Sequence, residues 1–152
     1  MGEEIEEATE AAVEPILEVA QETIEEIEEE DPILSPEDQE LIMRVAQAEA
    51  GNQGPEGIWL VECVIWNRIQ SPNFPGTAYE VVTQPHQFAT VKKGTYKKVK
   101  ISQEAREAMD RILEGDIAQY IIGFETTESQ ELDAYFEMAF QYRDHTFYVE
   151  KE

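Results

Sequence analysis

The chain has 152 residues, of which 34 are acidic and 11 basic, and its net charge is −23 at neutral pH. This length allows one domain with a sizeable core. Nucleic acid is not an expected partner, because phosphate binding requires lysines and arginines clustered over a whole face. A membrane span is also not expected, since no apolar run reaches the roughly 20 residues that it needs.

The acidic charge is concentrated in residues 1–40, which hold 17 of the 34 acids and no Lys or Arg. We expect residues 1–34 to be a solvated acidic linker with nascent helix. A docking or coiled-coil helix over residues 13–29 is the alternative. The chain start also lacks the basic region of a secretory signal peptide. Apolar residues recur in the segment at helical spacings: Val13, Leu17, Ala20, Ile24 and Ile27.

The domain is predicted to cover residues 35–152 and to open with a well-marked helix. Ser35 can cap the free N–H groups of the first turn, and Pro36 suits the first helical position. The helix should end at about Ala50, because Gly51 favours termination.

A second and much more apolar helix is expected to follow from Pro55 to about Ile69, where Ser71-Pro72 prevents its continuation. A helix that is apolar on nearly all sides is typical of a buried central element. It contains Cys63, the one cysteine of the chain, which cannot form an internal disulfide and is expected to be a small buried hydrophobe.

The second half of the chain mixes short helices with extended segments. The predicted fold is therefore α+β, mainly helical, with a small β-hairpin or sheet. Capping patterns, β-branched runs and turn residues predict the following elements: a short helix at 77–83, a strand at 84–91 that turns through 92–95 into a second strand at 96–99, a helix from Ser102 to Gly115, a strand at 118–126 and an extended aromatic run at 140–148.

Glu49 is the first candidate for chemistry, because it lies in the last turn of its helix, beside the glycine-rich break. The negative end of the helix dipole and burial both favour the protonated form of a carboxyl at this place. A carboxylic acid that stays protonated near neutral pH can donate a proton to a leaving oxygen. The alternative is an ordinary acid that points into solvent.

Several segments around Glu49 together resemble the SleB/CwlJ-type cell wall hydrolases, which include the spore cortex-lytic enzymes. The resemblance runs from about Leu41 to Tyr148, with the segments in the order of the family. They are Ala48-Glu49-Ala50-Gly51, Pro55-Glu56-Gly57, Val64-Ile65-Trp66-Asn67-Arg68-Ile69, Ser71-Pro72-Asn73-Phe74-Pro75, Gln84-Pro85-His86-Gln87-Phe88 and Arg143-Asp144-His145-Thr146-Phe147-Tyr148.

This resemblance implies a lysozyme-like fold and cleavage of the glycan strands of peptidoglycan, with Glu49 as the catalytic acid. The family's spore enzyme is a lytic transglycosylase that leaves a 1,6-anhydro-muramyl end. The chain departs from the family in two places. After Ala50 the chain has Gly51-Asn52-Gln53, where many relatives have arginine, glycine and glutamate. Tyr142-Arg143 replaces an apolar residue followed by glycine.

The resemblance also implies substrate contacts, since amide and hydroxyl groups suit the N-acetyl and hydroxyl groups of sugars. A helix C-cap is the alternative role for Asn67, and a structural histidine is the alternative for His145. Glu56 is either a helix-start acid, which the dipole favours, or a residue of the substrate groove. The implied contact residues are Asn67, Gln87, Phe88, His145, Tyr148 and Glu56.

Three further features leave alternatives open. Glu62 could be the buried partner of Arg44 or Arg68. Trp59 and Trp66 lie on one helical face, where core packing is favoured over a sugar-stacking platform. The basic cluster could attract wall carboxylates or teichoic phosphates, or could simply be a solvated hairpin tip. This cluster comprises Lys92, Lys93, Lys97, Lys98 and Lys100.

No cofactor and no metal are expected, since Cys63, His86 and His145 are scattered and no His-x-x-x-His pair occurs. The expected partner is peptidoglycan, the expected state a monomer, and the expected location the cell wall, outside the cytoplasm. Two rival functions remain at this stage: a non-catalytic peptidoglycan-binding module, and a hydrolytic muramidase that uses a second carboxylate.

Overall fold

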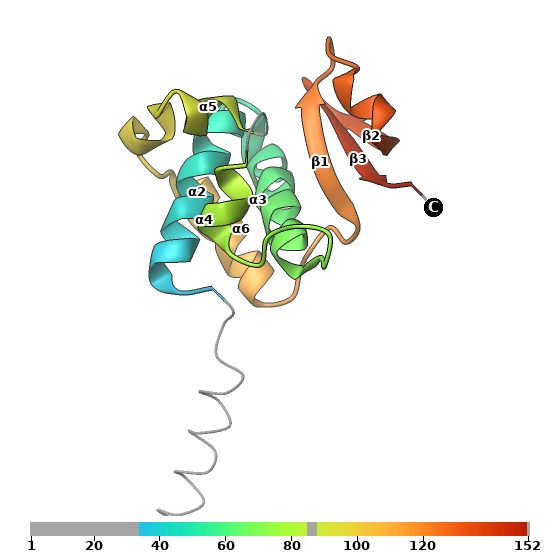
Figure 1. The fold of residues 1–152 in the computed structure, drawn as a ribbon. Helices are drawn as coiled ribbons and strands as arrows, with labels where there is room; N and C mark the ends of the chain where they lie inside the picture. Colours follow the sequence, from blue (N-terminus) through green and yellow to red (C-terminus); the bar gives the residue numbers. More distant parts are fainter. Residues whose placement is uncertain (1–33, 85–87, 152) are drawn as a thin grey trace, which may run out of the picture. The chain divides into compact units, whose positions relative to one another are not determined.

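Figure 1 shows the computed structural model of the chain, which describes residues 34–84 and 88–151. In this part of the chain, helices precede a three-stranded antiparallel sheet, which confirms the predicted α+β class. The helices are α2 (Pro36–Ala50), α3 (Gly54–Gln70), α4 (Ala78–Val82), α5 (Ala89–Lys92) and α6 (Gln103–Leu113), the 3-10 helices are η1 (Thr95–Lys98) and η2 (Glu131–Ala134), and the strands are β1 (Ile121–Thr126), β2 (Phe136–Tyr142) and β3 (His145–Glu150).

The helix starts follow the capping chemistry of the sequence. The hydroxyl oxygen of Ser35 accepts a hydrogen bond from the Asp38 N–H at 3.1 Å, and Pro36 occupies the first turn of α2. The hydroxyl oxygens of Thr77 and Ser102 cap α4 and α6 in the same way. The predicted helices over 35–50, 55–69, 77–83 and 102–115 are thus confirmed to within a few residues.

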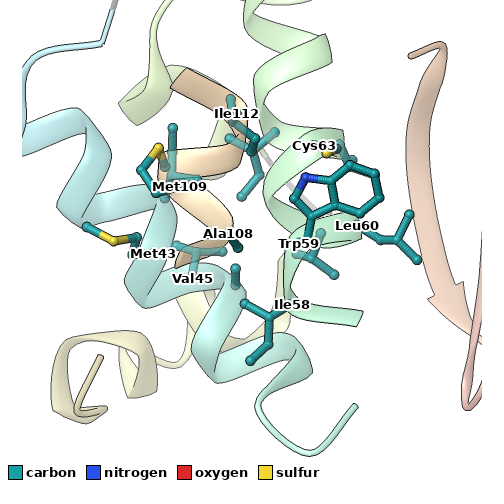
Figure 2. Packing of buried hydrophobic residues seen from close by; sticks show 14 of the residues in the cluster. Met43, Val45, Ile58, Trp59, Leu60, Cys63, Ala108, Met109 and Ile112 are labelled. Atoms are coloured by element: carbon teal, nitrogen blue, oxygen red, sulfur yellow. The ribbon is translucent and has the colours of Figure 1, made fainter. Parts of the chain in front are cut away.

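Helix α3 forms the centre of the core, as its apolar sequence predicted. It contacts α2, α4, α6 and β1. Figure 2 shows Ile58 and Cys63 of α3 in one cluster with Ala108, Met109 and Ile112 of α6. Burial raises the pKa of the Cys63 thiol to about 12, so this side chain stays protonated and packs as a small hydrophobe.

The sheet has the strand order β1-β3-β2. Strand β3 pairs with both neighbours, and its first residue, His145, lies opposite Thr126 of β1 and Tyr142 of β2. The extended aromatic run predicted for 140–148 is therefore two strands joined by a tight turn at Arg143 and Asp144. Arg143 has a positive φ of 48°, a conformation that glycine adopts more easily.

The hairpin predicted for residues 84–99 is wrong. Residues 85–87 lie outside the described part, and the rest of the segment forms α5 and η1. Phe88 is buried and Val91 packs against the same core. A spacing of three places two side chains on one face of a helix but on opposite faces of a strand. Core contact by both residues therefore favours the helical turn over the local β composition.

The strand predicted for 118–126 begins only at Ile121. The side-chain amide of Asn67 donates hydrogen bonds to the carbonyls of Ala118 and Ile121, at 2.8 and 2.9 Å. Between them, Tyr120 has a φ of 74°, which no regular strand contains. Helices with the length and apolar character of a membrane span do not occur in the described part of the chain. Residues 1–33, with their predicted linker or docking helix, lie outside it.

Candidate active site

Glu49 lies half-buried in the last turn of α2, facing the short helix α5. Its Oε1 atom accepts hydrogen bonds from the Thr90 hydroxyl at 2.8 Å and from the Thr90 N–H at 3.3 Å. Burial raises the pKa of Glu49, and the two Thr90 contacts oppose this shift. The carboxyl is therefore both fixed in orientation and shifted toward the protonated form, which is the predicted direction.

The corner between α2 and α3 is joined to the sheet by a reciprocal pair of hydrogen bonds. The Gln53 side chain is buried; its Nε2 donates to Oδ2 of Asp144, and its Oε1 accepts from the Asp144 N–H, both at 3.0 Å. Gln53 is one of the residues at which the chain departs from its relatives. It connects the loop after Glu49 to the β2–β3 turn, a role that sequence reasoning missed.

Gly54 allows the same turn to pack closely. It has a φ of +78°, and a Cβ atom there would lie 2.8 Å from an Nη1 atom of Arg143. Arg143 itself is in the turn between β2 and β3 and has a positive φ of 48°. The two segments with the expected departures from the family, 51–53 and 142–143, therefore lie close in space, since Gln53 bonds to Asp144 and Gly54 faces Arg143.

A row of aromatic rings extends across the sheet from the segment that carries Thr90. The Phe124 ring lies 5.9 Å from Phe88, 5.1 Å from His145 and 6.0 Å from Phe147, between ring centroids. Phe140, which is 38% exposed, stacks on Phe147 at 5.2 Å. Two predicted contact residues, Phe88 and His145, are thus brought together through Phe124, which sequence reasoning did not select.

His145 is buried, and its Nδ1 atom has no hydrogen-bond partner among the described residues. Burial lowers its pKa, with a smaller opposing contribution from Asp144, so the surroundings favour the neutral imidazole. The edge contacts of its ring with Phe124 and Phe147 agree with the structural alternative for His145, whereas the Nδ1 atom, unpaired within the described part of the chain, does not. Its role as a sugar contact stays a prediction.

Tyr148 projects to the other face of β3 from His145, because successive side chains of a strand alternate. Its hydroxyl donates to Oε2 of Glu125 at 2.5 Å, and Glu125 also accepts from Ser129 and from the Leu132 N–H. Burial and the Glu125 carboxylate raise the pKa of Tyr148. His145 and Tyr148 therefore cannot contact the same sugar ring from their present positions, although the sequence groups them.

Asn67 lies near the opposite end of α3 from the Glu49 corner. It is 13 residues beyond Gly54 in this helix, which corresponds to about 20 Å along the axis. Its amide nitrogen donates to the carbonyl of Ala118, which precedes β1, and to that of Ile121, the first residue of β1. Asn67 is also not the C-cap, which is Ser71.

Glu56 and Gln87 complete the set of predicted contacts. Glu56 is exposed in the first turn of α3, and its Oε1 atom forms an ion pair of 2.7 Å with Arg111. Arg111 also pairs with Asp116 and covers the Trp59 ring. This agrees with the interpretation of Glu56 as a helix-start acid. Gln87 lies outside the described residues.

Glu62 does not have the arginine partner that the sequence suggested. Its carboxyl is fully buried, and neither oxygen has a hydrogen-bond partner among the described residues. Arg44 instead binds Glu40 and the Val99 carbonyl, while Nε of Arg68 donates to the Ile122 carbonyl. Burial, with a contribution from Asp110, raises the pKa of Glu62 to about 9.

The five lysines of the basic cluster are exposed on or beside α5 and η1, in the same segment as Thr90. The alternative that they form a hairpin tip is wrong, because this segment folds into α5 and η1. Attraction to wall anions stays a prediction. Groups of three or more His, Cys, Asp or Glu that could hold a metal ion do not occur among the residues that the structure describes.

The arrangement of helices and sheet is that of the SleB catalytic domains. The catalytic domain of the germination-specific lytic transglycosylase SleB from Bacillus anthracis matches with a TM-score of 0.66 and 19% identity, over 76% of this chain and 96% of that chain. The catalytic domain of the Bacillus cereus SleB protein matches with a TM-score of 0.66 and 20% identity, over 75% and 91%. These matches show a common fold.

The family follows from the sequence match. The family model described as Cell Wall Hydrolase matches residues 52–148, which is more than half of the chain. The chain belongs to this family of cell wall hydrolases, and the resemblance drawn from the motifs is confirmed. The matched range begins after Glu49, so it does not include this residue. No curated protein matches the sequence.

Proposed function

We propose that this protein cleaves the glycan strands of peptidoglycan between N-acetylmuramic acid and N-acetylglucosamine, as a lytic transglycosylase acting at the cell wall. The observation that carries the proposal is the half-buried Glu49 carboxyl, whose pKa is raised and whose orientation is fixed by Thr90. Membership of the cell wall hydrolase family supports the substrate class. The reaction type is supported by the fold that this chain shares with the catalytic domain of the Bacillus anthracis lytic transglycosylase SleB.

In the proposed reaction, protonated Glu49 donates its proton to the bridging glycosidic oxygen as the bond from this oxygen to the anomeric carbon breaks. The resulting Glu49 carboxylate then accepts the proton of the muramyl 6-hydroxyl, whose oxygen bonds to the anomeric carbon. The products are a 1,6-anhydro-muramyl end and a free hydroxyl on N-acetylglucosamine. The proton returns to Glu49, and no water is consumed.

Thr90 suits both halves of this cycle. Its hydroxyl and its N–H direct two hydrogen bonds to the same oxygen, Oε1. These bonds stabilise the carboxylate that exists between the two proton transfers, while burial favours the protonated starting state. Because the nucleophile belongs to the substrate, one carboxyl is sufficient.

The test is mass spectrometry of the muropeptides that the purified protein releases from peptidoglycan. We expect anhydro-muramyl products from the wild type and none from Glu49→Gln. Glu40→Gln is the matched control, because Glu40 is an exposed acid on the same helix. It should release the same products as the wild type.

Other product patterns would contradict the proposal. Reducing muramyl ends would indicate a hydrolytic muramidase with a second carboxylate. An absence of release, with retained binding to the wall, would indicate a non-catalytic binding module. Undiminished release by Glu49→Gln would remove Glu49 from the mechanism.

A further inference from the structure

A pocket of about 640 Å³ lies between the C-terminal end of α3, the connection from α6 to β1 and the end of β3. These three segments can be followed in Figure 1. Its walls include Trp66 and Gln70 of α3, Gln119 and Tyr120 of the connection, and Glu150 of β3. The volume is within the range of small-molecule sites, roughly 300–1,000 Å³. Glu49 is not among its lining residues.

This pocket is at the other end of α3 from Glu49. Asn67, whose side chain also borders it, is 13 residues beyond Gly54, or about 20 Å along the helix. A ligand of the size of one sugar ring could not bridge that distance, whereas an extended glycan strand could reach both places. The pocket is therefore a separate site and not a part of the acid's immediate surroundings.

The Tyr120 side chain is presented to the pocket at a cost in backbone strain. Its φ of 74° is unusual for a bulky residue, and 77% of its surface is exposed. Asn67 holds this conformation by donating to the carbonyls on either side of Tyr120, those of Ala118 and Ile121. Strain that the surrounding structure maintains in this way is concentrated at functional positions.

The lining selects the ligand chemistry. Two aromatic side chains, Trp66 and Tyr120, can stack on a flat apolar face, and the amides of Gln70 and Gln119 can bind hydroxyl and N-acetyl groups. None of the described residues that line the pocket is a lysine, arginine or histidine, so they offer no counter-charge for an anion. The acid, Glu150, already accepts hydrogen bonds from Ser71 and Asn73. A neutral N-acetylated hexosamine ring fits this lining, because it has an apolar face for stacking and hydroxyl and N-acetyl groups for the amides.

We propose that this pocket is a second glycan site, which binds an N-acetylhexosamine ring at a distance from the bond that is cut. This inference rests on the proposed function, because it assigns the ligand to the same glycan strand. In this arrangement the glycan strand is bound both at Glu49 and at the pocket. Asn67 is a positioning residue of the pocket, because it holds the backbone on either side of Tyr120.

The probe is tetra-N-acetylchitotetraose, and the measurement is the intrinsic tryptophan fluorescence of the full chain. Trp66 borders the pocket, whereas Trp59 is buried beneath Arg111. We expect a saturable change of emission that is lost in Trp66→Phe. Tyr120→Ala should weaken binding roughly fivefold to tenfold, as expected for the loss of one stacked aromatic ring. Tyr120→Phe retains the ring and should bind like the wild type.

Tyr79→Ala is the matched control, because Tyr79 is an exposed tyrosine of α4 that does not line the pocket. It should leave the titration unchanged. Unaltered binding by Tyr120→Ala, or no saturable change of emission in the wild type, would overturn the inference.

The two proposals can fail separately. Saccharide binding that depends on Tyr120, without release of muropeptides, would leave the pocket as a glycan site and reject the proposed reaction. Release that depends on Glu49, without saccharide binding at Trp66, would support the proposed reaction and reject the pocket as a glycan site.

Discussion

Glu49 is half-buried and Glu62 is fully buried on the neighbouring helices α2 and α3, and burial raises the pKa of both. Their surroundings differ in every other respect. Glu49 lies at a helix end, is partly exposed and accepts two hydrogen bonds from Thr90. Glu62 lies in the middle of α3, is fully buried and accepts none from any described residue.

This comparison separates the features that make an acid useful from those that merely perturb it. A raised pKa keeps a proton on the carboxyl at neutral pH, but the proton must also reach a substrate. Glu49 combines a raised pKa with access to a substrate, because one side of it is open and Thr90 fixes the other. Glu62 is the more strongly perturbed of the two, yet it has no route to a substrate. We therefore expect it to influence stability and not the reaction.

The largest expected effect is the loss of activity in Glu49→Gln. The amide retains the shape of the side chain but cannot donate the acidic proton, and general acid catalysis typically contributes a factor of about 10² to 10⁴. Glu62→Gln should retain wild-type activity. Both are measured as the rate of muropeptide release, with circular dichroism as the control for folding. Equal losses in the two variants would remove the distinction between the acids.

The second effect is a gain in stability in Glu62→Met. Burying a carboxyl whose pKa is about 9 instead of 4.5 costs on the order of 3 kcal/mol at pH 7. Methionine has a similar shape and carries no such penalty. Urea unfolding should therefore give a higher midpoint with an unchanged slope. Glu56→Met, which replaces an exposed acid of the same helix, should not produce this gain. A destabilised Glu62→Met would show that the carboxyl has a stabilising contact.

The third effect is the pH dependence of the free energy of unfolding that arises from Glu62. Below the unfolded pKa of 4.5, both states of Glu62 are protonated and the penalty is absent. As the pH rises toward 9 the unfolded chain loses this proton and the folded chain keeps it. Stability therefore falls, by up to about 1.4 kcal/mol per pH unit, and levels off above the folded pKa. The difference in unfolding free energy between Glu62→Gln and the wild type should grow over this window. A constant difference would contradict the prediction.

The smallest effect is expected for Thr90→Val. This change removes a hydroxyl that lowers the pKa of Glu49 and leaves the backbone N–H in place. The pKa of Glu49 should rise, so that the acid stays protonated to higher pH. We expect the high-pH limb of the pH–rate profile to shift upward, with a loss of maximal rate of a few fold. Thr90→Ser retains the hydroxyl and should behave like the wild type. A shift to lower pH would contradict the proposed contact.

Much of this architecture could be predicted because its causes are local. Caps such as Ser35 and Ser102 and the break at Gly51 mark helix ends through bonds made within one turn. The apolar composition of α3 requires burial wherever the helix lies. The 84–99 segment could not be predicted in this way. There, the fate of Phe88 and Val91 depended on a core surface formed by distant residues, and it overrode their β propensity.

The features of the candidate site can also be separated into those with local causes and those set by residues far apart in the chain. The sequence by itself determined the fold class, the family resemblance and the selection of Glu49, because these depend on residue order and on the position of an acid at a helix end. The tertiary structure alone decided which groups surround each acid. It brought Thr90 into contact with Glu49, left Glu62 without the expected arginine, bonded Gln53 to Asp144 and placed Asn67 beside the pocket at the far end of α3. The physical reason is that burial and hydrogen bonding between residues far apart in the chain are set by packing, which no local pattern encodes.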